Sequence, residues 1–338
     1  METTDFAKHL ADFFAKYLPG ERGASKNTIQ AYRDTFVLLF TFMEQARSIK
    51  PKKLQLSNLT RENIMAFLNW LEAVKGNSVR TRNSRLAAIR SFFGYLQYVE
   101  PANILECQRV MSIHVKKTEK KIMNYLTVEG IRLLLKQPEQ GTWRGRRDLA
   151  LIALMYDTGA RVQEVADLAV RNIRLLEPYT ITITGKGNKT RIVPMMKEQM
   201  NLLIQYMQEN NLLEDTYRPT SLFFNTRNEK LTRAGIAYIL QKYLQMARQE
   251  NPTLTPEGIS CHSLRHSKAM HLLQAGVPLI YIRDLLGHES VVTTEVYARA
   301  DSLQKRKALE NAFEKVSDDP KPPSWQTNQN LLDWLKNL

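Results

Sequence analysis

The sequence predicts a mainly α-helical protein of two domains, the second of which carries a small antiparallel β-sheet. Apolar residues recur at helical spacing through most of the chain. By contrast, Thr180–Thr184 alternates between polar and apolar residues, as a half-buried strand does. A polar and basic stretch at 113–124 interrupts the helical pattern. We therefore expect a helical domain over residues 1–112, a basic linker over 113–124, a second domain over 125–316, and a spacer with a short helix over 317–338.

Three helices are expected in the N-terminal domain. The first follows a polar start at Ser25–Thr28, the second begins after the N-cap candidate Thr60, and the third follows the break at Gly76–Ser78. The third helix carries four arginines, Arg80, Arg82, Arg85 and Arg90. These arginines either form a solvated face or contact DNA phosphates, because the guanidinium donor fork matches phosphate oxygens.

The linker is rich in lysine, which would suit a chain that wraps around a nucleic-acid duplex. Its candidate DNA contacts are Lys116, Lys117, Lys120 and Lys121. The second domain is expected to begin with a helix capped by Thr127. Further along, the strand at Thr180–Thr184 is followed by a turn and by a return strand that starts at Arg191. Lys189 in the turn and Arg191 are further candidates for DNA contacts.

The charge of the chain narrows the class of partner. Of the 338 residues, 48 are Lys or Arg and 34 are Asp or Glu, which makes a formal net charge of +14. Nucleic acid is the commonest partner of so cationic a protein, because neutralised phosphates release condensed counterions, although a merely basic surface would have the same composition. The two cysteines, Cys107 and Cys261, make no disulfide framework. With no signal peptide and no apolar run that could cross a bilayer, we expect a cytoplasmic, nucleoid-associated protein without membrane contact.

The C-terminal segment is a candidate for contact between subunits. A Pro-rich spacer at Asp318–Ser324 precedes a stretch in which apolar residues recur, namely Leu331, Leu332, Trp334, Leu335 and Leu338. A short apolar helix at the end of a spacer can dock on another subunit or on its own domain, and the sequence leaves both open.

Four motifs of the second domain hold chemically active side chains, and each is ambiguous alone. Arg161 and Glu164 lie at i and i+3, the spacing of an ordinary helix ion pair. Lys186 lies at the tip of the expected hairpin, where lysines are usually solvated, and the glycine pattern of a P-loop is missing.

The third motif contains His262, Arg265 and His266. His262 and Arg265 project from one face of a helix, so an anion between them would relieve their repulsion. His262 and His266 have the i, i+4 spacing of zinc ligands, but no further pair of ligands completes such a site. We therefore expect neither a metal ion nor a cofactor.

The fourth motif runs from Gly287 to Tyr297. Gly287 is a natural residue for the end of a helix, so His288 is expected to begin a new segment and Tyr297 to lie on the next helix. Taken alone, Tyr297 has the pattern of a half-buried core tyrosine.

Together these motifs contain the groups that phosphoryl transfer to a phenol requires. Two arginines can hold the non-bridging oxygens of a phosphate, and fixed donors can stabilise the negative charge that develops there. A lysine or histidine can protonate the leaving 5′ oxygen, while a histidine takes the phenol proton. We also expect the cations to lower the pKa of the Tyr297 phenol. In this arrangement the protein supplies the positive charge, and no metal ion is required.

In their order and spacing these motifs closely resemble those of the tyrosine recombinase family, the lambda-integrase-like and Xer-like enzymes. The matching motifs are Thr-Gly-Ala-Arg161 with Glu164, Gly-Lys186-Gly-Asn-Lys-Thr-Arg, His262-Ser-Leu-Arg265-His266, and Leu-Leu-Gly-His288 followed nine residues later by Tyr297. The resemblance extends from about residue 125 to 300, and the N-terminal helices look like the family's SAM-like core-binding domain. Ala160 and Gln163 depart from the residues usual in the family, at positions that carry no chemistry.

The resemblance implies a C-shaped clamp of two domains around duplex DNA, and it implies roles for single residues. Tyr297 would attack the scissile phosphate and form a 3′-phosphotyrosyl bond. Arg161, Arg265 and His288 would hold the phosphate, and Lys186 would be the general acid. His262 would be the general base or a phosphate ligand, Glu164 would orient Arg161, and His266 would support the site. Four protomers would exchange strands between two specific recombination sites through a Holliday junction, with the C-terminal tail linking the homotetramer.

The biological role stays open among several alternatives. The tail after residue 316 extends the minimal Xer-like layout, which favours an enzyme that serves a mobile element by integration, excision or transposition. Xer-type resolution of chromosome dimers, a type IB topoisomerase-like relaxase and a catalytically silent DNA-binding regulator are the alternatives.

Overall fold

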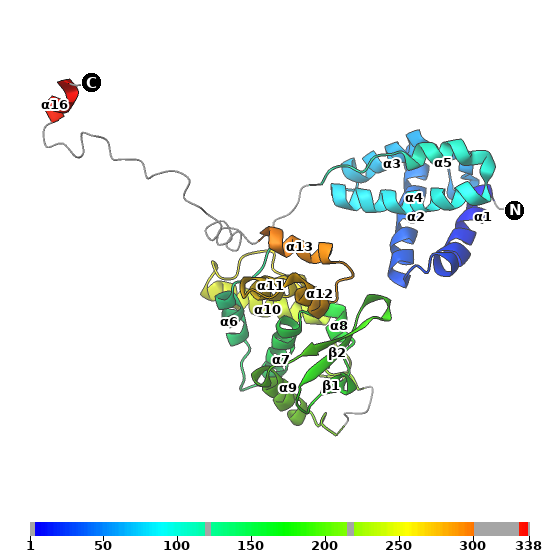
Figure 1. Cartoon of the computed structure of the whole chain (residues 1–338). Coiled ribbons are helices and arrows are strands. Elements are labelled where there is room, and N and C mark those ends of the chain that lie inside the picture. Colours follow the sequence, from blue (N-terminus) through cyan, green and yellow to red (C-terminus); the bar gives the residue numbers. More distant parts are fainter. Residues whose placement is uncertain (1–3, 119–122, 215–219, 301–330, 337–338) are drawn as a thin grey trace. The chain divides into compact units, whose positions relative to one another are not determined.

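A computed structural model describes residues 4–118, 123–214, 220–300 and 331–336 of the chain (Figure 1). Contacts between residues divide the chain into two compact units, Met1–Lys121 and Ile122–Leu338. The predicted fold class is confirmed, because helices dominate and the described residues of the second unit contain a single three-stranded antiparallel sheet. In these four ranges no helix is both long and apolar enough to span a bilayer.

Helices are the only regular elements in the described residues of the first unit. The three expected helices are present, and Ser25, Thr60 and Ser78 each cap one of them by accepting a hydrogen bond from a backbone N–H in the first turn. The elements are α1 (Asp5–Asp12), the π-helical η1 (Phe13–Glu21), α2 (Lys26–Arg47), η2 (Pro51–Lys53), η3 (Leu56–Asn58), α3 (Arg61–Ala73), α4 (Val79–Val99), η4 (Pro101–Asn103) and α5 (Ile104–Met111). The sequence also predicted a helical domain here, but no single helix was expected at the positions of α1, η1 and α5.

A cluster of buried aromatic rings holds the first unit together. The ring centroids of Phe6, Phe13 and Phe36 lie 5.7, 5.3 and 5.3 Å from that of Phe92, in edge-to-face contacts. These rings come from α1, η1, α2 and α4, so the cluster fixes the first three elements against α4. The helix that carries the four predicted DNA-contacting arginines is thereby anchored in the core through Phe92.

The second unit is helical around one hairpin. Its elements are α6 (Val128–Lys136), α7 (Trp143–Thr158), α8 (Val162–Ala166), η5 (Val170–Asn172), β1 (Ile173–Arg174), β2 (Thr180–Thr184), η6 (Lys186–Asn188), β3 (Thr190–Pro194), α9 (Lys197–Glu209), α10 (Arg233–Glu250), α11 (Cys261–Gln274), α12 (Leu279–Leu286), α13 (Val291–Ala300) and α16 (Leu331–Lys336). Thr127 caps α6 as expected. The predicted spacer lies outside the described residues, and of the expected apolar C-terminal helix only the range of α16 is described.

The expected hairpin is confirmed, with Thr180 paired to Pro194 and Thr184 paired to Thr190. β3 packs against α12, and the turn end of the hairpin projects from the unit (Figure 1). The short strand β1 adds a third strand to it, which the sequence pattern did not predict. The core of the unit centres on α7, which is buried over most of its length and packs against α9 and α11.

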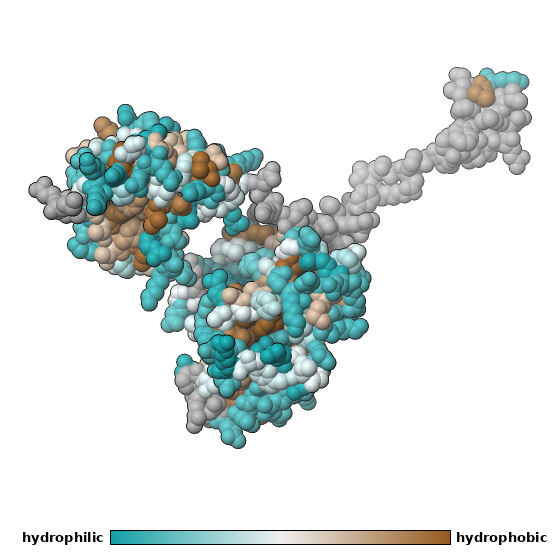
Figure 2. All heavy atoms as spheres, turned by 180° about the vertical axis from the view of Figure 1, so that it is seen from behind, coloured by the Kyte–Doolittle hydropathy of each residue, from teal (hydrophilic) through white to brown (hydrophobic). Residues whose placement is uncertain are grey.

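Helices α11, α12 and α13 pack on one another around a smaller apolar cluster that includes the ring of Tyr297. Hydrophilic residues cover most of the surface in view on each unit (Figure 2). The motifs singled out above lie at the start of α8, at the hairpin, in the first turns of α11, and on α13 with the residues that precede it.

Candidate active site

Arg161 is placed by a tight turn at the end of α7. Gly159 ends that helix with a φ of +57°, and a Cβ at this position would lie 2.6 Å from Leu286 Cδ2. Only a residue without a side chain adopts this left-handed conformation easily and fits this gap. Arg161 then begins α8, where its backbone N–H donates to Glu164 Oε2 at 3.0 Å. The turn thus brings Arg161 beside the end of α12.

The Glu164 carboxylate joins two arginines from different elements. Its Oε1 accepts a hydrogen bond from Arg161 Nη1, and its Oε2 accepts one from Arg191 Nη2, each at 2.7 Å. Burial acts to raise the pKa of Glu164, whose side chain is 4% exposed, but the hydrogen bonds from Arg191 and Arg161 outweigh burial and hold that pKa below its usual range. Glu164 is therefore charged at neutral pH and sets the direction of both guanidinium groups.

Arg265 is buried between α7 and α12. Its Nη1 donates to the Gly159 carbonyl oxygen at 2.8 Å and its Nη2 to the Leu286 carbonyl oxygen at 2.6 Å. Burial, with Arg161 nearby, lowers the pKa of Arg265 to about 10, so the group stays cationic at neutral pH. Its buried Nε has no hydrogen-bond partner among the described residues. A cation with a spare donor in this position suits an incoming anion.

His288 follows the C-terminal glycine of α12, as predicted. Gly287 has a φ of +63°, and a Cβ there would lie 3.0 Å from Arg191 Nη1. The His288 Nδ1 lies 3.0 Å from Thr294 Oγ1, a contact that holds the ring at the start of α13. Burial, together with the positive charges of Arg265 and Arg161, lowers the pKa of His288 to about 4. The imidazole is neutral at physiological pH.

Tyr297 lies on α13 with its ring 2% exposed and its hydroxyl group among polar side chains. The ring stacks on that of His288, with centroids 6.3 Å apart and planes inclined by 9°. The hydroxyl oxygen lies 3.1 Å from His266 Nδ1 and is close enough to Arg265 for the positive charge of the guanidinium group to act on it. The phenol is thus sheltered from water but open to the cations of the site.

The expected lowering of the phenol pKa is wrong for the protein without DNA. The pKa of Tyr297 is raised, because burial favours the neutral phenol more strongly than Arg265 and Arg161 favour the phenolate. The sequence shows the positive charges but not the degree of burial, so the stronger of the two effects was missed.

His262 and His266 lie one above the other on α11. Their ring centroids are 4.3 Å apart and their planes are inclined by 76°. His262 is exposed, whereas His266 is half-buried. Burial and neighbouring cations lower the pKa of both, and that of His266 falls to about 4. Both rings are largely neutral at pH 7 and can accept protons.

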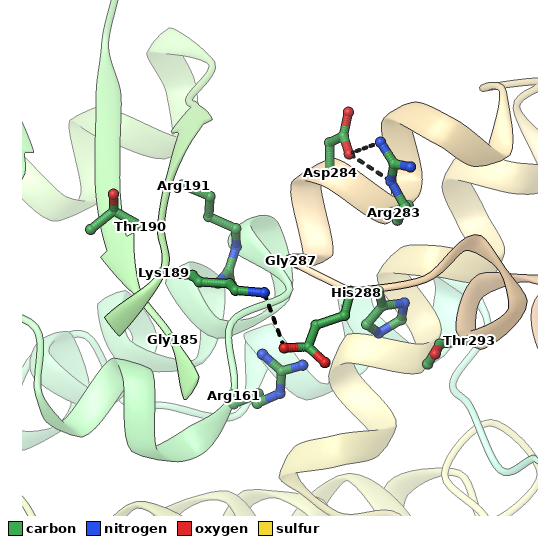
Figure 3. A pocket seen from close by; sticks show the side chains of 11 residues that line it. Arg161, Gly185, Lys189, Thr190, Arg191, Arg283, Asp284, Gly287, His288 and Thr293 are labelled. Atoms are coloured by element: carbon green, nitrogen blue, oxygen red, sulfur yellow. Dashed lines mark hydrogen bonds and ion pairs between the residues drawn. The ribbon is translucent and has the colours of Figure 1, made fainter. Parts of the chain in front are cut away.

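A pocket of about 660 Å³ opens beside these groups. Figure 3 shows Arg161, Lys189, Arg191 and His288 around it, from α8, the hairpin and the start of the segment after α12. Lys189 Nζ forms an exposed ion pair with a Glu289 carboxylate oxygen at 3.2 Å. A second hollow of about 240 Å³ lies against Arg161 and is lined in part by His262 and Arg233, a cationic residue that the motifs did not single out.

The structure therefore brings together Arg161, Glu164, His262, Arg265, His266, His288 and Tyr297. The backbone of Lys186 lies in η6 at the tip of the hairpin, but its side chain is outside the described part of the chain. Within the described ranges no three His, Cys, Asp or Glu side chains are grouped so as to hold a metal ion.

Among the four α4 arginines that were predicted to contact DNA, Arg82 and Arg90 are not exposed. Arg82 is 1% exposed and donates to Asn83 Oδ1 and the His114 carbonyl oxygen. Arg90 is half-buried and donates to the Ile113 carbonyl oxygen. Both therefore attach the end of the unit to α4 and do not fit the prediction of phosphate contacts.

Arg80 and Arg85 fit that prediction better. Arg80 is exposed, and both residues line a groove of about 390 Å³ between α2 and α4. Arg85 also donates to the Ala31 carbonyl oxygen at 2.9 Å, which leaves part of its guanidinium for a ligand. Lys116 and Lys117 are exposed, whereas Lys120 and Lys121 lie outside the described residues.

On the hairpin, Arg191 is the residue whose position differs most from the predicted one. It was predicted to contact DNA, but its side chain is only 10% exposed and is paired with Glu164. Its Nε also donates to the Leu285 carbonyl oxygen at 2.8 Å, so it ties β3 to the end of α12. The sequence does carry a signal for this role, because Arg191 occupies an inward position of the strand. That signal alone does not distinguish a buried arginine from an exposed one; the packing of α12 against β3 does.

Two family models match the chain. The model described as "Phage integrase family" matches residues 124–304, and the model described as "Phage integrase, N-terminal SAM-like domain" matches residues 11–98. A Sinorhizobium fredii protein named as an integrase/recombinase is 36% identical over 329 residues, which are 97% of this chain and 97% of that protein. The tyrosine recombinase XerD of Listeria innocua is 32% identical over 297 residues, which are 87% of this chain and 95% of that protein.

Solved structures share the fold. The XerH site-specific recombinase, in a pre-cleavage complex with a difH substrate, is 25% identical with a TM-score of 0.64 over 89% of this chain and 84% of that chain. The integrase of the Tn1549 transposon, in complex with transposon right end DNA, is 14% identical with a TM-score of 0.68 over 89% of this chain and 98% of that chain. The second similarity concerns the fold alone.

Proposed function

Since the chain belongs to the phage integrase family of tyrosine recombinases, enzymes that cleave and rejoin DNA strands, we propose that it recombines two specific DNA sites through a covalent bond to Tyr297. The observation that carries the proposal is the position of the Tyr297 hydroxyl, which contacts His266 and lies within the influence of the Arg265 and Arg161 charges. A tyrosine that served packing alone would not need to direct its hydroxyl into a group of cations.

The scissile phosphate would bind between the two arginines. Arg161 is held by Glu164 with part of its side chain exposed to the pocket, and Arg265 retains a donor without a partner among the described residues. His288 lies beside Arg161 in the lining of the same pocket and would add a neutral donor. These groups are fixed before DNA binds, so they would stabilise the charge on the pentavalent phosphorus without reorganisation.

Cleavage then exchanges one phosphate ester for another. The Tyr297 oxygen forms a bond to phosphorus, the bond from phosphorus to the 5′ oxygen breaks, and Lys186 protonates that oxygen. The phenol proton passes to a base, with His262 as the general base or as a further phosphate ligand. The 3′-phosphotyrosyl bond keeps the energy of the phosphodiester, so a 5′ hydroxyl from the partner site can reverse the step without a nucleotide cofactor.

Recombination of two sites would require four protomers and a Holliday junction. The C-terminal segment, which includes α16, would link neighbouring protomers in a closed ring. We favour a mobile-element role in integration, excision or transposition, which the integrase/recombinase name of the Sinorhizobium fredii protein supports. Resolution of chromosome dimers, supported by the similarity to XerD, is the second candidate. Either role would place the protein at the nucleoid.

Trapping of the covalent bond tests the proposal. A nicked suicide substrate that releases a short fragment after cleavage should accumulate a protein–DNA adduct with the wild-type chain and none with Tyr297→Phe. Tyr156→Phe is the matched control, because Tyr156 is also a shielded tyrosine whose hydroxyl contacts a histidine of α11, at 2.8 Å from His271 Nδ1, and its loss should leave the adduct in place. A wild-type chain that binds the DNA but forms no adduct would support the catalytically silent regulator instead.

The same substrates separate the remaining alternatives. A relaxase would remove supercoils from a plasmid that carries one site, whereas a recombinase requires two sites. Because the target sequence depends on which side chains face the grooves, sequencing of the DNA that the protein rearranges would identify the sites and the biological role.

A further inference from the structure

The hydrogen-bond partner of Tyr297 is His266, the second histidine of its motif. The distance from His266 Nδ1 to the Tyr297 hydroxyl oxygen is 3.1 Å, and the two ring centroids are 5.6 Å apart. The contact joins α11 to α13, which pack on each other. His262, by comparison, contacts the ring of His266, and none of its contacts within the described residues reaches Tyr297.

The neighbouring arginine favours one direction of this hydrogen bond. The positive charge of Arg265 acts on the Tyr297 oxygen and favours negative charge there. An arrangement in which the hydroxyl donates its proton to His266 Nδ1 places electron density on that oxygen, next to the cation. His266 then accepts the proton at Nδ1 and, as a neutral imidazole, carries its own proton on Nε2.

The surroundings of His266 keep its imidazole neutral and able to accept a proton. Burial lowers the pKa of His266 to about 4, with further lowering from His262 and Arg265, so Nδ1 has a free lone pair at neutral pH. Among the described residues, the charged and titratable groups that act on His266 or on Tyr297 are His262 and Arg265 of α11, His288 before α13, and Arg161 at the start of α8. A phosphate between Arg161 and Arg265 would offset their charge and make His266 a stronger base.

We infer that His266, and not His262, accepts the Tyr297 proton during cleavage. As the bond from the tyrosine oxygen to phosphorus forms, the O–H bond breaks and its proton moves to His266 Nδ1, while Lys186 gives a proton to the leaving 5′ oxygen. The reverse step returns the proton to the tyrosine. This inference rests on the proposed function and resolves the role of His262, which is left to bind the phosphate.

The decisive variant is His266→Asn, because its side-chain oxygen can accept a hydrogen bond near the position of Nδ1 but cannot take up a proton. The matched control is His271→Asn, which removes a histidine of the same helix whose Nδ1 also contacts a tyrosine hydroxyl, that of Tyr156, outside the candidate site. Each variant is compared with the wild-type full-length chain for DNA affinity and for the single-turnover rate of adduct formation.

The substrate should carry sulfur in place of the bridging 5′ oxygen. A thiolate leaves without a proton, so the pH dependence reports on the tyrosine side of the reaction alone. For His266→Asn we expect a rate roughly 100-fold below wild type near neutral pH. The rate should also rise by about tenfold per pH unit, because the phenol must then lose its proton to hydroxide or solvent. The wild type and His271→Asn should share a profile that is much flatter over the same range.

Two results would overturn the inference. The first is a His266→Asn variant whose rate of adduct formation and pH profile match the wild type. A rate that is lowered by the same factor at every pH has the same meaning, since a structural role would lower the rate without a change in slope. The second concerns His262→Asn, which keeps His266 and should therefore keep the flat profile; a steep profile there would assign the base to His262. The second variant decides the question even if His266→Asn does not fold. If the wild type itself forms no adduct, the proposed function fails instead.

Discussion

Glu164→Gln should be the most informative single change in the second unit. The substitution keeps the shape of the side chain but removes the charge from a carboxylate that is 4% exposed. Glu164 accepts three hydrogen bonds, two from Arg161 and one from Arg191. A glutamine has one acceptor oxygen, and its amide group would place N–H donors against a guanidinium group.

The magnitude follows from the burial of the partners. The Arg191 side chain is 10% exposed and would lose its carboxylate, whereas Arg161 is 38% exposed and can reach water. Loss of one partner of a buried ion pair costs about 3–5 kcal/mol, and we expect the low end, about 3 kcal/mol, because one hydrogen bond survives. This is a large part of the roughly 5–15 kcal/mol that stabilises an ordinary domain. Cleavage should also fall by about 100-fold, because a misplaced Arg161 no longer meets the phosphate.

Hydrogen exchange of the most protected amides in α7 and α11 measures the stability loss within the full-length chain. Asp167→Asn is the matched control, since Asp167 lies at the end of the same helix and pairs with Lys230 where both side chains are about half exposed. It should change stability by less than about 1 kcal/mol. A second comparison adds Arg191→Met to Glu164→Gln, which removes the stranded cation and should restore stability but not cleavage. Equally small losses of stability in Glu164→Gln and Asp167→Asn would show that the Glu164 carboxylate does not hold the two arginines in place.

Three further predictions concern the rest of the molecule. The pKa values of His266 and His288 fall to about 4 in the folded chain, so the unfolded chain binds protons first as the pH falls from about 6.5 towards 4. The contribution of these histidines to stability should be complete above that window and should decrease by up to about 3 kcal/mol per histidine within it. Urea unfolding at several pH values would measure this decrease. Gly159→Ala, with a φ of +57° and a contact of 2.6 Å, should cost about 1–3 kcal/mol and lower the melting temperature, whereas Gly94→Ala, whose Cβ would meet open space, should not. Arg80→Ala should weaken DNA binding and reduce the slope of log K against the logarithm of the salt concentration by about one unit. The change of the buried Arg82 to alanine should reduce stability and leave that slope unchanged. Binding titrations at several salt concentrations would measure both slopes.

The elements with strong local signals were predictable. Thr60 and Thr127 cap helices where the sequence placed them, because a side-chain oxygen satisfies an N–H of the first turn whatever the rest of the fold does. The hairpin is equally local, since alternation along Thr180–Thr184 and a polar turn define both of its strands. The π-helical η1, in contrast, contains Pro19 and Gly20, which interrupt the helical pattern and concealed it.

The candidate site was predictable in its members but not in its contacts. The sequence paired Arg161 with Glu164 by spacing, and the structure adds Arg191 to the same carboxylate across 27 positions of the chain. It also predicted Arg82 and Arg191 to contact DNA, whereas Arg82 is buried and the Arg191 side chain is only 10% exposed, each with partners inside its own unit. Exposure depends on what packs over a side chain, and that information lies elsewhere in the sequence.

By itself, then, the amino-acid order determined the helical class, the hairpin, the cationic character and the kinds of side chain available for phosphate chemistry. Tertiary packing alone decided that the Tyr297 hydroxyl contacts His266, and that burial raises the pKa of this phenol despite the nearby cations. The physical reason is range: caps, turns and periodicity act over a few residues, whereas desolvation and hydrogen bonds between α11 and α13 depend on groups that only the folded chain brings together.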